Sequence, residues 1–352
     1  MDLEEIRDRT ASLLAYAGFA GPFDLSALGS GANNRVFRLR VQESRFLLKV
    51  YFTHPDDRRD RLGAEFSFLR FAWEHGIRSI PKPLSCDAAA RLGLMEYLEG
   101  CPFRAGEVTE HAVHEARSFY RALNQRKTSR AAGLLPLASE ACFSLGEHME
   151  CVANRIRRLE SIEPEMGIDA EAATFIRDDL VPAWKDVHDS VRLSARGAGL
   201  SLDEPLSRGA WCLSPSDFGF HNALRTGDGC TRFFDFEYAG WDDPARMVCD
   251  FFCQPAVPVP LDYLKAFAES VTADSPDPQA IRARIHLLFP VYRIKWCCIF
   301  LNDFLRGGAA RRRFALGKDS ENRKARQLAE ARSTLEAVYS FEGRPWRMSI
   351  SS

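Results

Sequence analysis

The chain has 352 residues, enough for two to three domains or for one two-lobed unit, and its 46% hydrophobic and 27% charged residues are typical of a soluble globular protein. The formal net charge of −1 excludes a strong field that would recruit nucleic acid or an anionic membrane. The first residues are acidic and amphipathic, so no signal peptide is expected.

The longest apolar stretch, residues 285–305, is interrupted by Pro290, Arg293 and Lys295 and therefore predicts a buried helix instead of a membrane span. The 10 cysteines are scattered and show no metal-ligand spacing. We therefore expect buried, reduced cysteines in a cytoplasmic protein.

The first hundred residues predict a small sheet with two helices. Residues 3–18 predict a short helix that buries Ile6, Leu13 and Leu14. Residues 24–51 predict three strands, separated by a glycine-containing turn and a polar turn. Residues 56–75 predict an amphipathic helix that ends at Gly76, and a short buried strand follows in residues 92–100.

After Gly100 the pattern becomes mainly helical, and residues 211–241 are the exception, with turns and strands. Apolar residues recur at helical spacing in residues 107–124, 144–160, 170–193, 259–272, 277–304 and 319–341. The sequence therefore predicts an α+β fold with two lobes. Residues 1–99 form a small antiparallel-sheet lobe, and residues 100–352 form a large, mainly helical lobe.

Three features of the first lobe suit phosphate binding. Gly29 and Gly31 lie between two strands, where glycine lets backbone amides approach phosphate oxygens, although an ordinary hairpin turn explains them equally well. Lys49 is a lone cation in the apolar strand FLLKVY, and it needs an anionic partner unless it reaches solvent at an edge. Glu65 on the following helix could be that partner, or a solvated residue.

Two motifs of the second lobe suit metal-assisted chemistry. LSPSDFGFHNALR contains Asp217 and, five residues later, Asn222, and RFFDFEYAGWDDP contains Asp235. The order of a glycine loop, strand lysine, helix glutamate, Asp-x4-Asn and later Asp matches the protein-kinase arrangement of phosphoryl transfer. Separate explanations of each residue do not predict this order.

From about residue 24 to residue 306, the chain resembles the aminoglycoside phosphotransferase and choline kinase family. That resemblance implies a two-lobed protein-kinase-like fold. It places Asp217 at the position of the catalytic Asp and Asn222 and Asp235 at the metal-binding positions. Asp243-Pro244 and Asp250 fall on supporting positions, and Glu65 falls on the position that pairs with the strand lysine.

The loop around Asp217 departs from the family pattern at two places. The family usually has His-Gly before the Asp, and this chain has Pro215-Ser216. Residues 218–221, FGFH, stand where the family often has Leu-His-Pro-Gly. His221 is therefore either a catalytic base or, as we expect, a structural loop histidine, and the departures put the substrate more in doubt than the reaction.

The resemblance implies ATP and Mg²⁺ as cofactors. Lys49 would bind the α- and β-phosphates with Glu65 as its brace, and Asp217 would align the acceptor hydroxyl. The linker backbone at Glu96–Leu98 would bind adenine. The remaining nucleotide contacts would come from the loop residues Gly29, Ser30, Gly31 and Asn34.

The expected acceptor is a small-molecule hydroxyl compound such as a sugar or an amino alcohol, because residues 101–210 have only a slight acidic excess. An aminoglycoside or other antibiotic kinase is the less favoured alternative, because aminoglycoside sites usually need strongly acidic walls and the sequence shows no dense acidic cluster. Glu237, Trp241 and Asp242 are the residues expected to contact the acceptor. We expect neither nucleic acid nor a membrane as partner, despite a basic stretch at residues 306–327, and we expect a monomer or a homodimer.

Two further alternatives stay open. A pseudokinase that binds nucleotide as a scaffold would not need Lys49, Asp217, Asn222 and Asp235 together. A protein kinase is disfavoured, because no activation segment ending in Ala-Pro-Glu follows Asp235.

Overall fold

The computed structural model describes residues 2–28, 34–54, 57, 59–162, 167–305 and 321–341. These residues group into two compact units. The first contains residues 2–141 and 206–282, and the second contains residues 142–205, 283–305 and 321–341. The predicted lobe boundary at residues 99 and 100 lies within the first unit and stays a prediction.

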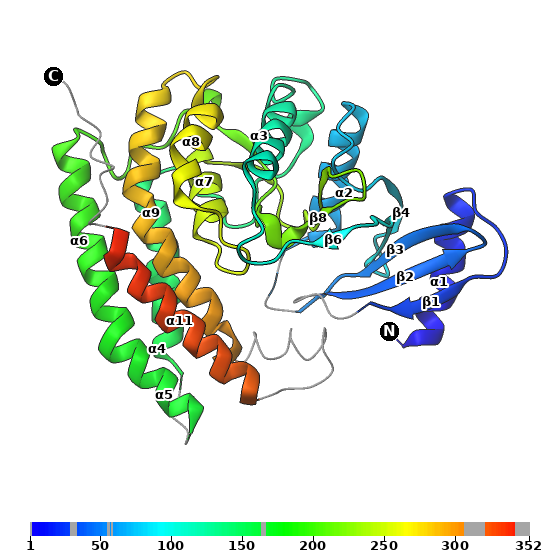
Figure 1. Ribbon diagram of the computed structural model, residues 1–352, viewed down its shortest axis with the longest axis horizontal. Helices are drawn as coiled ribbons and strands as arrows, with labels where there is room; N and C mark the ends of the chain where they lie inside the picture. Colours follow the sequence, from blue (N-terminus) through cyan, green and yellow to red (C-terminus); the bar gives the residue numbers. More distant parts are fainter. Residues whose placement is uncertain are drawn as a thin grey trace. The chain divides into compact units, whose positions relative to one another are not determined.

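A five-stranded antiparallel sheet forms the N-terminal part of the first unit (Figure 1). Its strands follow the order β1-β2-β3-β5-β4. Their bounds are Asp24–Ala27 for β1, Arg35–Val41 for β2, Ser44–Val50 for β3, Pro83–Asp87 for β4 and Leu92–Glu96 for β5. The register pairs Val36 with Lys49 and Lys49 with Gly93, so Lys49 lies on a central strand.

Helix α1 (Leu3–Tyr16) covers one face of this sheet. Ile6, Leu13 and Leu14 are buried there, as the sequence predicts. The helix begins where the side chain of Asp2 accepts a hydrogen bond from the Glu5 amide at 2.9 Å. The apolar face that it covers alternates along the strands and consists of Phe37, Leu39, Val41, Phe46, Leu48, Val50, Leu92 and Leu94.

Helix α2 (Arg61–Glu74) is shorter than the predicted helix over residues 56–75. It begins at Arg61 because Asp60 caps it and accepts from the Gly63 amide at 3.1 Å. It ends before Gly76, whose φ of +82° is the left-handed conformation that glycine adopts at helix ends. Strand β4 was not predicted. It starts at Pro83, because a missing amide is tolerated on an edge strand.

The remainder of the first unit combines short strands with helices (Figure 1). Strand β6 (Cys101–Pro102), β8 (Ala223–Arg225) and β9 (Thr231–Phe233) form one sheet, and β7 (Cys212–Ser214) pairs with β10 (Gly240–Asp242). Its helices are α3 (Glu110–Asn124), α7 (Pro244–Cys253) and α8 (Leu264–Thr272), with 3-10 turns at Ala132–Leu134, Arg208–Ala210, Phe220–Asn222 and Leu261–Tyr263. The sequence did not predict α7, because all of its residues are buried and no polar face marks it.

The second unit consists of long helices, as predicted for residues 144–160, 170–193, 277–304 and 319–341. Helix α4 spans Leu145–Glu160, α9 spans Pro278–Phe300 and α11 spans Glu321–Phe341, with a 3-10 turn at Leu301–Phe304 after α9. Helices α5 (Ile168–Phe175) and α6 (Val181–Gly197) are joined by a π-helical turn at Ile176–Leu180. Pro182 lies two residues after that turn and lacks the amide that a regular helix would use. The predicted α+β fold, with a sheet followed by helices, is therefore confirmed.

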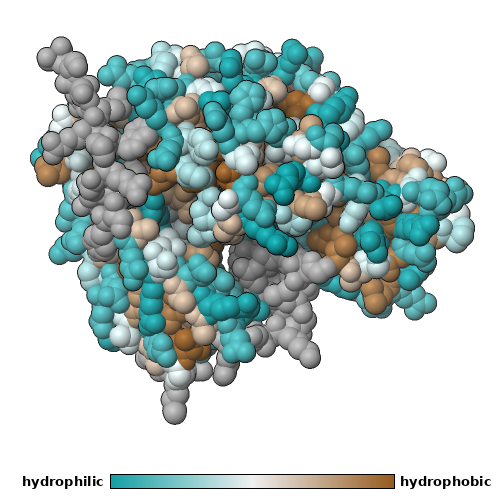
Figure 2. Space-filling model, in the orientation of Figure 1, coloured by the Kyte–Doolittle hydropathy of each residue, from teal (hydrophilic) through white to brown (hydrophobic). Residues whose placement is uncertain are grey.

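On the face that Figure 2 draws, teal and white residues predominate, and brown residues occur in small separate groups. In the part of the chain that the structure describes, no helix is both long enough and apolar enough to cross a bilayer.

We predict that Asp243→Ala lowers the free energy of unfolding by about 1–2 kcal/mol, because Asp243 caps the N-terminus of α7. Its carboxylate accepts from the Ala245 amide at 2.7 Å, and the residue is fully buried. Chemical denaturation measures the change. Asp243→Asn, which keeps an acceptor oxygen, is the matched control and should lose less; an alanine variant as stable as the wild type would contradict the assignment.

Candidate functional site

The Lys49 ammonium is the centre of a buried charged cluster. Lys49 is 4% exposed, and its Nζ donates to Glu65 Oε2 at 2.7 Å and to Asp235 Oδ1 at 2.5 Å. Glu237 Oε2 lies 3.8 Å from the same nitrogen. The structure thus brings together the predicted strand lysine, helix glutamate and downstream aspartate.

Glu65 connects helix α2 to the segment that follows β9. Its Oε2 also accepts from the Tyr51 hydroxyl at 2.6 Å, and its Oε1 accepts from the Phe236 amide at 3.0 Å. Both carboxylate oxygens are therefore used. This fixes Glu65 against Lys49 on one side and against the residue after Asp235 on the other.

Burial and charge act in opposite directions on these groups. Burial works to lower the pKa of Lys49, but the carboxylates of Asp235, Glu65 and Glu237 outweigh it and hold that pKa well above its ordinary value. Withdrawal from solvent raises the pKa of Asp235 to about 7 against the opposing effect of Lys49, although 32% of its side chain stays exposed. The cluster therefore holds more carboxylate charge than Lys49 alone balances.

Asp217 and Asn222 lie in the loop between β7 and β8. The Asn222 Nδ2 donates to the Asp217 carbonyl at 3.0 Å and to Asp217 Oδ2 at 3.3 Å. The Asn222 carbonyl accepts from the Phe234 amide at 3.0 Å, which places Asn222 beside the residue before Asp235. The β8–β9 hairpin thus joins the two predicted motifs.

Phenylalanines hold this loop in place. Phe218 and Phe220 are buried, and both ring centroids lie within 6.3 Å of those of Phe233 and Phe251. Alternate residues therefore point into the core, while Asp217 and His221 keep more of their surface exposed. The unusual FGFH sequence is explained by packing against β9 and α7, without reference to an acceptor.

Three non-glycine residues in the two site segments have left-handed backbones. The φ angles are +47° for Ser216, +45° for Asp217 and +68° for Asp235. Such angles are uncommon outside glycine and occur often at functional sites, where surrounding contacts enforce them. At position 216 the family resemblance indicates glycine, so this chain tolerates a strained serine there.

His221 contacts the Asp217 side chain. Its Nε2 lies 3.2 Å from Asp217 Oδ1, and its side chain is 17% exposed. A histidine at this position fixes one oxygen of the carboxylate, while Asn222 contacts the other. The geometry therefore agrees with a structural loop histidine.

The predicted nucleotide-binding residues are only partly described. Gly29, Ser30 and Gly31 lie outside the described residues. Asn34 is buried, Glu96 ends β5 and accepts from the Lys82 amide at 3.0 Å, and Leu98 belongs to the irregular segment that follows. Their contacts with a nucleotide stay predictions.

The residues expected to contact an acceptor are buried. Glu237 accepts from Asn34 Nδ2 at 2.6 Å, Trp241 donates from Nε1 to the Ala132 carbonyl at 3.0 Å, and Asp242 pairs with Arg246 at 3.1 Å. The supporting residue Asp250 also lies near Arg246, at 3.5 Å. This geometry favours structural roles, and contact with an acceptor stays a prediction.

The donor set suits Mg²⁺ bound together with phosphate. Among the described residues, no group of three His, Cys, Asp or Glu side chains could hold a metal ion alone. Mg²⁺, however, commonly uses one or two carboxylates with substrate phosphates and water. Asn222 and Asp235 offer such oxygen ligands, and part of the Asp235 side chain stays exposed although it pairs with Lys49.

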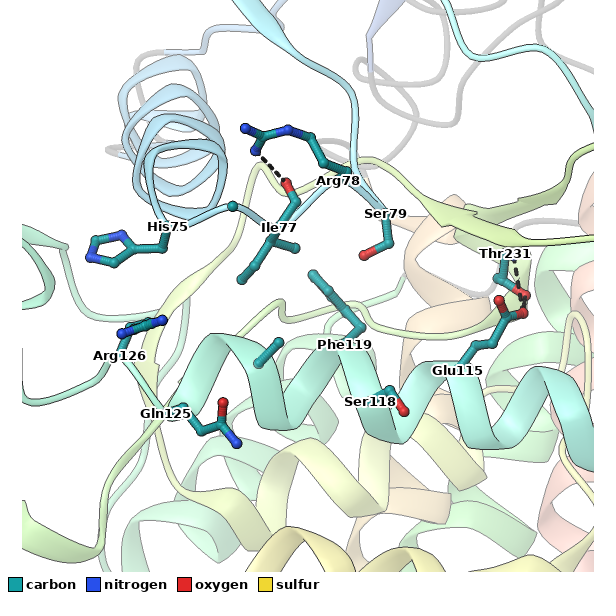
Figure 3. Close-up of a pocket in the computed structure, with 12 residues that line it drawn as sticks. His75, Ile77, Arg78, Ser79, Glu115, Ser118, Phe119, Gln125, Arg126 and Thr231 are labelled. Carbon is teal, nitrogen blue, oxygen red and sulfur yellow. Dashed lines mark hydrogen bonds between the residues drawn. The ribbon is translucent and has the colours of Figure 1, made fainter.

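A separate cavity lies between residues 75–79 and helix α3, with Thr231 of β9 at one end (Figure 3). It has a volume of about 340 Å³ and shares no lining residue with the Lys49 cluster. Ile77, from the loop after α2, and Phe119, from α3, give it apolar walls, and Glu115 accepts from the Thr231 amide at 3.0 Å at one end. The Ser79 carbonyl accepts from the Phe233 amide at 2.7 Å, so the walls of this cavity support β9.

Sequence reasoning missed Arg61, Tyr51 and the contact of Asn34 with Glu237. Arg61 precedes Glu65 by four residues, so helical spacing alone would have placed both on one face. Tyr51 follows Lys49 by two residues and shares its side of the strand. The Asn34–Glu237 contact joins residues 203 apart and has no local pattern.

A model of the phosphotransferase enzyme family matches residues 24–283. No curated protein sequence is similar enough to count as a match. Among solved structures, a choline/ethanolamine kinase family protein from Mesorhizobium loti has 18% identity and a TM-score of 0.59, with 97% of this chain and 100% of that chain covered.

Two other structures show the same fold. A spectinomycin phosphotransferase, solved with ADP and spectinomycin, has 12% identity and a TM-score of 0.62, with 95% of this chain and 98% of that chain covered. A choline kinase from Streptococcus pneumoniae has 14% identity, a TM-score of 0.57 and coverages of 95% and 98%. The predicted protein-kinase-like fold is confirmed.

We predict that Ser216→Gly raises the free energy of unfolding by up to about 1 kcal/mol. Glycine removes the strain of the left-handed backbone, and this gain exceeds the loss from its greater entropy in the unfolded state. Thermal or chemical denaturation measures this effect. Ser216→Ala keeps the strain and serves as the control. A glycine variant less stable than the alanine variant would show that the backbone angle is not what limits this position.

Proposed function

The chain belongs to the phosphotransferase enzyme family, and from that membership we propose that it transfers the γ-phosphate of ATP, with Mg²⁺, to a hydroxyl group of a small molecule. The observation that carries this proposal is the hydrogen bonding of Lys49 to both Glu65 and Asp235. A lysine held in this way is a fixed cation, which is what an α- and β-phosphate pair requires. Two of the similar structures were solved with ADP, which supports nucleotide use.

Asp217 is the proposed catalytic residue. Its side chain is 33% exposed, so it can reach a hydroxyl group, and Asn222 and His221 orient its two oxygens. It would accept a hydrogen bond from the acceptor hydroxyl and align that oxygen with the γ-phosphorus. His221 then acts as an orienting neighbour and not as the base.

Asn222 and Asp235 are the proposed Mg²⁺ ligands. The Asn222 amide nitrogen donates to Asp217, which turns the amide so that its side-chain oxygen is the group left for a metal. When bound, the ion would neutralise phosphate charge and relieve the excess of carboxylates around Asp235. Lys49 supplies the remaining positive charge.

The proposed nucleotide contacts follow the sheet. The backbone of Glu96–Leu98, directly after β5, would bind adenine, and amides of residues 30–34 would cover the phosphates. The strand register supports this placement. Leu47 lies two residues before Lys49 on β3, and it pairs with Met95, which lies one residue before Glu96 on β5. Adenine near that row and phosphates near Lys49 would span adjacent positions of one sheet face.

A neutral or mildly polar acceptor, such as a sugar or an amino alcohol, suits the chain better than a polycationic antibiotic. Residues 101–210 carry only a slight acidic excess, which gives little basis for the strongly acidic walls that a polycationic compound would need. An aminoglycoside kinase, which needs acidic walls, is the second candidate because similar structures include aminoglycoside phosphotransferases.

A pseudokinase scaffold is the competing function of another class. The joint presence of Lys49, Asp217, Asn222 and Asp235 in one connected arrangement favours an active enzyme. A cytoplasmic monomer or homodimer completes the proposal.

A coupled assay of ADP release over sugars, amino alcohols, aminoglycosides and macrolides tests the proposed function. Asp217→Ala provides the blank for each compound. We expect at least one hydroxyl compound to stimulate ADP release above this blank. Nucleotide binding without stimulation by any compound would favour the scaffold.

We predict that Asp217→Asn lowers turnover by about 10²–10⁴-fold, because the hydroxyl loses its negatively charged acceptor. The affinity for ATP should stay within a few-fold of the wild type. Steady-state kinetics with calorimetric titration of ATP separates the two effects. A turnover near that of the wild type would remove Asp217 from its role.

We predict that Asp235→Ala abolishes the Mg²⁺ dependence of nucleotide binding, because it removes a carboxylate ligand and a partner of Lys49. Titration of ATP at several Mg²⁺ concentrations measures this dependence. Asp228→Ala, an exposed aspartate in the β8–β9 turn, is the control. An unchanged Mg²⁺ dependence in Asp235→Ala would rule out the assigned ligand.

A further inference from the structure

Arg61, the first residue of helix α2, is a buried cation close to the Lys49 cluster. It is 2% exposed and precedes Glu65 by one helical turn, so the two opposite charges share a face of the helix. Glu65 binds the Phe236 amide, and Arg61 lies against the next residue, Glu237. Helix α2 therefore meets the segment after Asp235 at two charged points.

The contacts of Arg61 explain its burial. Its Nη2 lies 2.5 Å from Asp57 Oδ2, its Nη1 donates to the Phe52 carbonyl at 3.1 Å, and its Nε lies 3.7 Å from Glu237 Oε1. The rings of Phe52 and Tyr238 each lie 5.8 Å from its guanidinium carbon. A guanidinium removed from water in this way needs both carboxylates to offset its desolvation.

Glu237 also contacts Asn34, which precedes β2. It is 2% exposed, and its Oε2 accepts from Asn34 Nδ2 at 2.6 Å. The Asn34 Oδ1 in turn accepts from the Phe52 amide at 3.0 Å. Asn34 is therefore held at both ends of its amide, by Glu237 and by the chain that follows β3.

Arg61 also provides a second positive charge near Glu237, in addition to Lys49. Glu237 lies 3.8 Å from Lys49, farther than Glu65 or Asp235. Without Arg61, Lys49 would be the nearest cation to Glu237 among the described residues. Arg61 therefore shares the charge of Glu237 with Lys49: it lies near Oε1, while Oε2 accepts from Asn34.

We propose that Arg61 is a positioning residue for nucleotide binding, which acts through Glu237 to hold the side chain of Asn34 in place. The proposal rests on the proposed function, since it concerns the same ATP site. Arg61 does not itself touch ATP. Its loss should weaken nucleotide binding more than it lowers turnover at saturating ATP.

The test compares Arg61→Met, Arg61→Lys and Arg59→Met. Arg59 pairs with the same Asp57 but is more exposed, which makes it the matched control. For Arg61→Met we expect the Kd for ATP with Mg²⁺ to rise about tenfold, with the KM for ATP rising more than kcat falls. Arg61→Lys should recover most of this affinity, and Arg59→Met should stay within twofold of the wild type.

A second variant keeps the test decisive if Arg61→Met does not fold. Asn34→Asp is nearly isosteric and places a carboxylate against Glu237, so it breaks the same contact without altering the buried arginine. We expect a similar loss of ATP affinity in the folded variant, and its melting temperature should fall because Glu237 then faces a second buried carboxyl group. If both variants fold and both bind ATP within twofold of the wild type, the proposal is overturned. If Arg61→Met does not fold, the same result for Asn34→Asp alone overturns it.

The wild-type titration separates this proposal from the proposed function. A wild-type protein that binds no nucleotide would remove the ATP site itself, and the role of Arg61 with it. A wild-type protein that binds ATP, with variants that bind it equally well, would contradict only the role of Arg61.

Discussion

Burial of the Lys49 ammonium is the constraint on which the rest of the site depends. A cation in the central strand of a sheet must have carboxylates within reach, because the cost of leaving it unpaired exceeds what the fold can tolerate. Glu65 from helix α2 and Asp235 from the segment after β9 meet this requirement at 2.7 and 2.5 Å. One side chain thereby ties together a strand, a helix and a segment almost 200 residues away.

The polar cluster keeps its geometry because apolar packing holds the segments that carry it. Phe218 and Phe220 anchor the loop of Asp217, and Phe236 stacks on Phe68 of α2 at 4.9 Å between ring centroids. The left-handed backbones at Ser216, Asp217 and Asp235 persist because this packing allows no relaxed alternative. Stability from the aromatic core thus maintains strain at the polar residues, as expected for a preorganised site.

The order of motifs in the sequence was enough to predict the fold and the grouping of Lys49, Glu65 and Asp235, because each has a distinctive residue type at a distinctive place. The burial of Arg61 and the Asn34–Glu237 contact could not be predicted in this way, since they depend on which segments meet in space. Helix α7 was missed because it has no polar face. Strand β4 was missed because it begins at a proline, a residue that is rare in strands other than edge strands. Gly29, Ser30 and Gly31 lie outside the described residues, so their predicted contacts with phosphate rest on the sequence.

Calorimetric titration of ATP into the wild-type protein, with and without Mg²⁺, tests the central claim most directly. If Lys49, Asn222 and Asp235 form a nucleotide site that is completed by a divalent cation, ATP binds with one-to-one stoichiometry and binds much more weakly once Mg²⁺ is removed. Absence of ATP binding under both conditions would contradict the account, because the Lys49 cluster would then be a structural ion network only.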